Sequence, residues 1–227
     1  SHGHEDHFHL EAINGILKKN KKTKVIVPQS KNNWFKNVIK KVGFKKVISL
    51  KHNETFEISS NSSLKLFLND KGDFDSSIIV KSRKDEIFLQ TDNIMSIKES
   101  KRIGRENNIF MSFLMPYSTG IFPGLYEFET KLMKKLAYQK KISSLKYTTE
   151  VAKNLNAKYN IPYANDLCYL GDLYYLNYLH SFDKNEFLQY LSKKNINSII
   201  MSPGDIIHIL NRKIVRKWDN KYFVQIY

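Results

Sequence analysis

The chain has 227 residues, of which 41% are hydrophobic and 13% aromatic, so it is long enough for one large domain with its own core and is not disordered as a whole. Its single cysteine, Cys168, excludes an internal disulfide and a zinc cluster built on cysteines. No apolar run reaches the roughly 20 residues that cross a bilayer, and no signal-peptide pattern opens the chain, which predicts a soluble, cytoplasmic protein with no membrane partner.

The formal net charge of +15 would attract nucleic acid, membrane surfaces or anionic small molecules. The lysines are scattered, however, and they accompany a general excess of Asn and Ile that is typical of a biased genome composition. Arginine is scarce, and no nucleic-acid-binding motif is present. The lysines are therefore interpreted as a solvated surface coat, and no nucleic-acid partner is expected.

The first quarter of the chain predicts alternating helices and strands. Apolar residues at helical spacing are followed by short apolar runs, and this alternation builds layered α/β sheets. The expected elements are helix 8–19, strand 24–27, helix 34–42 and strand 46–50. Gly43 is expected to end the second helix, and Phe44 to pack beneath this layer.

From residue 54 onward the pattern changes to successive strands separated by Asn, Gly, Asp and Lys turns, which predicts a meander. The expected strands are 55–58, 64–68, 76–80, 87–89 and 109–113. Residues 126–158 contain no Gly or Pro and predict one broken helix or two consecutive helices, ended by Pro162. Short helices are expected at 173–178 and 186–193, and a strand at 198–201. Residues 1–227 are predicted to form one domain, with a helical insertion at about 125–160.

A dense cluster of metal-binding side chains opens the chain. Three histidines and two carboxylates fall within the six residues His2-Gly3-His4-Glu5-Asp6-His7. Imidazole nitrogen and carboxylate oxygen are donors that zinc and iron accept, so the segment predicts a metal-binding loop. The alternative is a remnant of an expression tag, although tags do not usually run directly into Asp-His and an amphipathic helix. His9 is expected on the helix surface and not at the metal.

His2, His4, Asp6 and His7 match a His-x-His-x-Asp-His motif, and on these residues the chain resembles the metallo-β-lactamase superfamily. The resemblance implies an α/β fold, a four-layer αββα sandwich whose first N-terminal strands are missing from this chain. It also implies that His2 and His4 bind one metal ion and that Asp6 and His7 bind a second. Asp92, which follows an apolar strand, is the expected bridging ligand.

Within that superfamily the chain resembles the metal-binding domain of CMP-N-acetylneuraminate hydroxylase-like proteins. The matching stretches are residues 1–7, 72–77, 89–92, 118–123 and 160–164. Proteins of this branch usually carry an upstream Rieske iron–sulfur domain. The resemblance therefore implies that the chain is a C-terminal portion with a Rieske domain before it.

Two positions depart from the superfamily pattern. An ungapped register puts Lys71 where a further ligand histidine is expected, and the terminal ligand histidine is replaced within residues 202–205. The number of ions, one or two, is therefore left open. His52, His180 and His208 are spare candidates, although a lone histidine is more often a surface or hydrogen-bonded residue.

Metal-assisted hydrolysis of an anionic small molecule is the leading interpretation, because a bound zinc or iron ion lowers the pKa of water to roughly 7 and polarises a scissile bond. Asp6 and Asp92 would orient the attacking water, and Lys71 would face an anionic group such as phosphate or carboxylate. One alternative is an oxygenase component that hydroxylates a nucleotide sugar, and another is a binding module with a degenerate site. The loop with Gly120 and Pro123 is expected near the metal.

Overall fold

A computed structural model describes residues 7–71, 75–116, 122–164, 169–180, 183–202, 204–208 and 213–215. The chain divides into two compact units. Unit 1 comprises Ser1–Met115 and Glu150–Ala157, and unit 2 comprises Pro116–Thr149 and Lys158–Tyr227. The single domain expected from the sequence would include both units, and that expectation stays a prediction.

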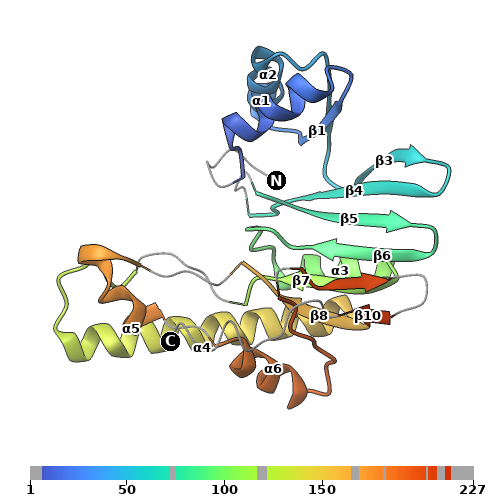
Figure 1. Ribbon diagram of the computed structural model, residues 1–227. Coiled ribbons are helices and arrows are strands. Elements are labelled where there is room, and N and C mark those ends of the chain that lie inside the picture. The colour runs from blue at the N-terminus through green and yellow to red at the C-terminus, as the bar shows by residue number, and fades with distance from the viewer. Residues whose placement is uncertain are drawn as a thin grey trace. The chain divides into compact units, whose positions relative to one another are not determined.

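Unit 1 begins with an N-terminal lobe, residues 8–50, in which two helix–strand pairs follow one another (Figure 1). Its elements are α1 (Leu10–Lys19), β1 (Lys24–Pro28), the 3-10 turn η1 (Lys31–Asn33), α2 (Trp34–Val42) and β2 (Lys46–Leu50). β1 and β2 pair in parallel, with Lys24 opposite Lys46. The predicted alternation is confirmed. α1 begins later than expected because His9 is its N-cap, with Nδ1 accepting the Ala12 N–H at 3.2 Å.

The core of the lobe comes from the apolar faces of its helices and strands. Its buried members are Val27, Phe35, Ile39, Phe44 and Val47, with Ile13 and Leu17 of α1 packed against them. Phe44 is buried as predicted. Gly43 ends α2 with φ +120°, and a Cβ built there would lie 2.9 Å from Cδ2 of Leu17. The last turns of α1 and α2 therefore lie against each other.

The predicted meander is confirmed in the rest of unit 1 (Figure 1). Its strands are β3 (Glu54–Ser59), β4 (Ser62–Leu68), β5 (Ser76–Ser82) and β6 (Asp85–Leu89), each antiparallel to the next. β7 (Ile109–Leu114) pairs in parallel with β6. β3 lies at the edge of the sheet, is mostly exposed, and has an irregular register between Glu57 and Ser59.

A helix that the sequence analysis did not predict, α3 (Ile97–Glu106), connects β6 to β7. A parallel pair needs such a crossover, and helices usually supply it. Ser96 is the N-cap, and its Oγ accepts the Glu99 N–H at 3.1 Å. A Cβ at Gly104 would lie 2.9 Å from both the carbonyl carbon of Asn154 and Cα of Leu155. α3 therefore packs directly on the backbone of residues 150–157.

Unit 2 is mainly helical. Its elements are α4 (Thr130–Leu155, with its last turn in unit 1), β8 (Tyr159–Pro162), η2 (Gly171–Leu173), α5 (Leu176–His180), α6 (Lys184–Ser192), β9 (Ile206–His208) and β10 (Lys213–Val215). α4 is one continuous helix, not a broken pair. The strand expected at 198–201 is wrong, because the pairing there is a single bridge between Asn160 and Ser198. Throughout the described residues, no helix is both long and apolar enough to cross a membrane.

Candidate metal centre

The structure brings together His7 and Asp92, two predicted ligands that are 85 positions apart in the sequence. Nε2 of His7 lies 3.2 Å from Oδ2 of Asp92, and the two side chains are 24% and 35% exposed. His7 precedes α1, and Asp92 follows β6. An imidazole and a carboxylate that meet at a partly open position form a donor pair that a divalent ion accepts.

The remaining predicted ligands, His2, His4 and Asp6, lie outside the described residues. Within the described part of the chain, no group of three His, Cys, Asp or Glu side chains has a metal-binding arrangement. Metal ligation by the five predicted residues therefore stays a prediction, of which the structure describes the two members His7 and Asp92.

The turn that carries Asp92 has an unusual backbone. Thr91 has φ +54°, a left-handed conformation that β-branched residues rarely adopt and that costs on the order of 1–3 kcal/mol. Its Oγ1 donates a hydrogen bond of 2.5 Å to the carbonyl of Ser76, at the start of β5. The turn is therefore held in a strained shape by a neighbouring strand, and this shape sets the direction of Asp92.

Gln90 is completely buried beneath the same turn. Its backbone N–H donates to the Phe113 carbonyl at 3.0 Å, and its Nε2 donates to the Asn93 carbonyl at 3.2 Å. Its Oε1 accepts the Met115 N–H at 3.0 Å, and its carbonyl accepts from Ser77 Oγ at 2.8 Å. Because both ends of the side chain are satisfied, Gln90 ties the Asp92 turn to β5 and to the end of β7.

A pair of buried asparagines links the Asp92 turn to the loop that contains Lys71. Nδ2 of Asn69 donates to Oδ1 of Asn93 at 2.9 Å, and Nδ2 of Asn93 donates to the Phe67 carbonyl at 3.4 Å. Oδ1 of Asn69 accepts the Lys71 N–H at 2.7 Å. The two loops are therefore held in a fixed relation by side chains that are 8% and 1% exposed.

Lys71 itself is exposed, and its positive charge is one of the causes that lower the pKa of the neighbouring Asp70. Its neighbour Asp70 accepts the Ser96 N–H at 2.8 Å, next to the start of α3. Partial burial acts to raise the pKa of Asp70, but the hydrogen bonds from the Ser96 side chain and backbone outweigh it and hold that pKa below its usual value. The predicted catalytic role of Lys71 stays a prediction.

Asp70→Asn is expected to reduce stability at neutral pH by about 0.5 kcal/mol, because a negative charge is lost beside the N-terminus of α3. The folded-state pKa of Asp70 lies below the ordinary value of 3.8, so its contribution is present above that pH and is lost as the pH falls through the folded value. Thermal unfolding of both proteins from pH 7 to pH 3 tests this. A stability difference that grows toward acid pH would contradict it.

Of the three spare histidines, His52 lies in unit 1, and there it contacts side chains of α3. Nε2 of His52 lies 3.3 Å from Oε1 of Glu99 and 3.1 Å from a guanidinium nitrogen of Arg102, on α3. Hydrogen bonds from Arg102 to Glu99 raise the pKa of the guanidinium, so this charge is permanent. A permanent cation beside His52 disfavours a second cation there. His208 is exposed on β9 of unit 2, and the side chain of His180 lies outside the described residues.

Two predicted features belong to unit 2. Gly120 lies outside the described residues, whereas Pro123 is buried in a segment where Lys140 Nζ donates to the Phe122 carbonyl at 3.2 Å. Burial lowers the pKa of Lys140. The proximity of this loop to the metal stays a prediction. In the turn expected to replace a ligand histidine, Asp205 Oδ2 accepts the Ser202 N–H, while its buried Oδ1 has no hydrogen-bond partner among the described residues.

Gln90, Asn69 and Asn93 shape the site but were not predicted from the sequence. The available signal was the position of these amides directly after β6 and β4, where strand ends commonly carry functional side chains. Their spacing alone fits an ordinary polar turn. Only the pairing of β4, β5 and β6 shows that the two turns adjoin.

No protein-family model matches the chain, and no curated protein matches it. Several solved structures, however, do match the chain. The chain is similar to Igni18, a metallo hydrolase from the archaeon Ignicoccus hospitalis, with a TM-score of 0.58 and 14% identity over 89% of this chain and 74% of that one.

Two further structures match with a TM-score of 0.50, over 89% of this chain and 72% of theirs. They are an isothiocyanate hydrolase from Delia radicum gut bacteria, at 12% identity, and the metallo-β-lactamase fold protein YhfI from Bacillus subtilis, at 10% identity. At such low identity the likeness concerns the fold alone. The α/β architecture predicted from the sequence is therefore confirmed: the chain has the metallo-β-lactamase fold.

Proposed function

We propose that the protein is a metal-dependent hydrolase that acts on an anionic small molecule. The observation that carries the proposal is the 3.2 Å approach of His7 Nε2 to Asp92 Oδ2, on a fold shared with a metallo hydrolase and an isothiocyanate hydrolase. Fold by itself supports many chemistries, so the donor pair is the more specific argument. That the His-x-His-x-Asp-His motif and the strand-end Asp92 bind one metal centre is an expectation from the sequence, which mutation of Asp92 tests.

The chemistry of the donors fits zinc or iron. His7 and Asp92 contribute one imidazole and one carboxylate, and His2, His4 and Asp6 are the predicted additional ligands. When bound there, the metal ion would lower the pKa of a bound water and polarise the bond to be cleaved. Asp92 would hold the ion and accept a hydrogen bond that orients the attacking water.

The protein's own contribution is a preformed turn. Thr91 is anchored to Ser76 and Gln90 is anchored to Met115, so the carboxylate of Asp92 needs no rearrangement to meet His7. A site whose supports are buried and hydrogen-bonded keeps its ligands oriented, which favours metal affinity and catalysis. Lys71, on the linked loop, is proposed to attract the anionic group of the substrate.

The test is metal analysis of purified protein followed by a hydrolysis screen with phosphoester, lactone and nucleotide-sugar substrates. Activity is expected to disappear after treatment with a chelator and to return when zinc, iron or manganese is added back. Hydrolysis that survives complete metal removal would refute the proposal. Metal analysis that finds no bound zinc, iron or manganese, even after these ions are added, would also refute it.

The oxygenase alternative rests on the resemblance to CMP-N-acetylneuraminate hydroxylase-like proteins. In this alternative the same predicted ligands would hold an iron ion. It is distinguished by supplying iron, a reductant and an electron-transfer partner, and by measuring oxygen consumption coupled to hydroxylation of a nucleotide sugar. Coupled consumption without any hydrolysis in the first screen would make this second function the better description of the site.

A further inference from the structure

The positive charge of the protein is concentrated in the N-terminal lobe. Residues 8–50 contain eleven lysines and one carboxylate, Glu11, so this segment holds ten of the fifteen net positive charges of the whole chain. A uniform bias in composition would spread the charge in proportion to length. The lobe therefore departs from the general lysine coat expected from the sequence.

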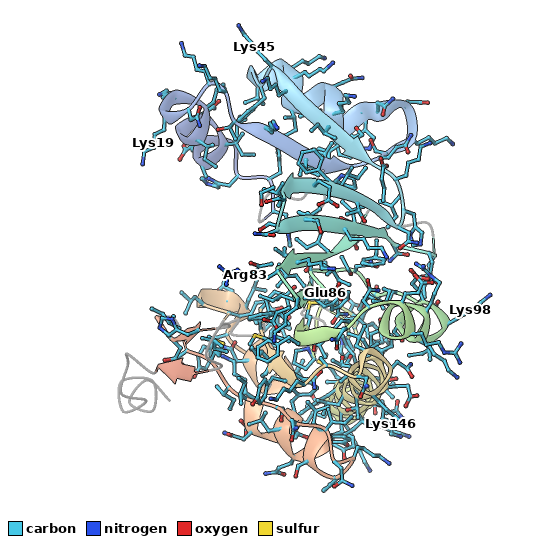
Figure 2. All side chains as sticks on the ribbon, turned by 90° about the vertical axis from the view of Figure 1, so that its right-hand side faces the viewer. Lys19, Lys45, Arg83, Glu86, Lys98 and Lys146 are labelled. Carbon is cyan, nitrogen blue, oxygen red and sulfur yellow. The ribbon has the colours of Figure 1, made fainter. Side chains whose placement is uncertain are left out.

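The topology gathers nine of these lysines at one end of the lobe. Because β1 and β2 are parallel, both strands start at the same edge, and each start directly follows the C-terminal end of a helix. The Gly43–Leu17 approach independently brings the two helix ends together. The resulting lysine end consists of Lys18, Lys19, Lys21, Lys22, Lys24, Lys40, Lys41, Lys45 and Lys46. Figure 2 shows Lys19 and Lys45 directed outward from the lobe.

The charge of the lysine end is exposed, and no ion pair offsets it among the described residues. All nine lysines are exposed, and within the described part of the chain the ion pairs of lysine involve Lys81 and Lys141 instead. Glu11 lies in the first turn of α1, at the other end of that helix. Lysines near helix C-termini offset the helix dipole, but this accounts only for those in the last turns of α1 and α2.

The lysine end is separate from the candidate metal centre. His7 precedes α1, whereas the lysines begin in the last turn of α1, and a helix of 10 residues is about 15 Å long. That length exceeds the Debye length of about 8 Å at physiological salt. A small substrate held at His7 and Asp92 would therefore gain little from these lysines, and their concentration needs a larger anionic partner.

We propose that the lysine end docks the protein on an anionic membrane surface. Clustered basic side chains attract anionic phospholipids, and here the fold gathers lysines from the ends of α1 and α2 and the starts of β1 and β2. Ile16 of α1 is 50% exposed and lies one turn before Lys19 on the same helix face, so it offers an apolar contact beside the charges. Such a contact is peripheral and needs no spanning segment, but it departs from the expectation of no membrane partner that was drawn from the sequence.

A lipid surface fits this end better than nucleic acid does. The lobe contains no arginine, so the forked contacts that guanidinium groups make with phosphates are missing. Its exposed tryptophan, Trp34, opens α2 and therefore lies at the end of that helix away from Lys40 and Lys41. No aromatic residue among the nine lysines is available for stacking on bases.

The experiment is sedimentation of the purified protein with vesicles of phosphatidylcholine alone or with about one third phosphatidylglycerol. Binding is expected only to the anionic vesicles and is expected to weaken as salt is raised. In the test variant, Lys19, Lys21, Lys22 and Lys45 are all changed to Gln. In the matched control, the exposed lysines Lys131, Lys134, Lys135 and Lys146 of α4 are changed to Gln.

Both variants lose the same charge, so only position distinguishes them. The test variant is expected to lose at least about 100-fold in its vesicle partition coefficient, since each lysine near an anionic surface contributes on the order of 1 kcal/mol. The control is expected to stay within about threefold of wild type. Equal losses in the two variants, or no binding by wild type, would overturn the proposal. Tighter binding of a 20-base-pair duplex than of vesicles, with the same dependence on these lysines, would also overturn it. Metal content and hydrolysis do not enter this test.

Discussion

Asp92→Asn is expected to lower metal affinity by more than about 100-fold and to abolish hydrolysis, while the protein stays folded. Asparagine keeps the shape of the side chain but removes the charge that a divalent ion requires. Loss of an outer-shell partner alone typically costs 10–100-fold, so loss of a ligand should exceed this range. The measurement is bound metal per chain after dialysis, with circular dichroism to check the fold.

The matched control for this variant is His9→Ser. His9 caps α1 through Nδ1, and serine is also a good N-cap, so the variant removes an imidazole near His7 without uncapping the helix. Metal content and activity are expected to match wild type. If Asp92→Asn retained its metal, or if His9→Ser lost it to the same extent, the assignment of Asp92 as a ligand would be wrong.

Gly104→Ala is expected to destabilise the protein by about 3 kcal/mol or more, although alanine is normally the better helix former. A Cβ at this position would collide with the backbone oxygen of Asn154, and backbone cannot turn aside as a long side chain can. α3 would have to move away from residues 150–157. For a chain of this length the expected fall in melting temperature is about 6–12 °C.

Gly15→Ala provides the control within the same protein. Gly15 also lies inside a helix, α1, but no atom lies within 4 Å of a Cβ built there. Alanine at this position is expected to stabilise the protein by roughly 0.5–1 kcal/mol. If Gly104→Ala lowers the stability while Gly15→Ala raises it, the loss at Gly104 comes from the contact with Asn154. A neutral Gly104→Ala would mean that α3 and residues 150–157 do not pack closely in solution.

Much of the fold could be predicted from the sequence because local patterns coincide with tertiary packing. α2 and β2 have the predicted bounds, since Gly43 ends the helix and apolar residues continue directly into the strand. α3 was not predicted because its apolar residues are few and its stability comes from the Ser96 cap and from Gly104. The apolar run 198–201 predicted a strand, yet its pairing is a single bridge between Ser198 and Asn160.

The site could be predicted only in part, for a similar physical reason. Asp92 was identified because a strand-end carboxylate at this place completes a metal motif, and the structure puts it beside His7. The amides of Gln90, Asn69 and Asn93 acquire their roles only when β4, β5 and β6 pair and bury them. A hydrogen-bond network between residues more than 20 positions apart has no local sequence pattern.

The edge strand β3 has a bearing on how the protein behaves at high concentration. An edge strand presents backbone donors and acceptors with which another copy of the chain can pair, and this is a common start of aggregation. β3 is short and mostly exposed, carries Glu54 and Glu57, and is irregular between Glu57 and Ser59. Charge and irregular register both disfavour the addition of a further strand. These mostly exposed residues therefore help to keep separate molecules from joining their sheets.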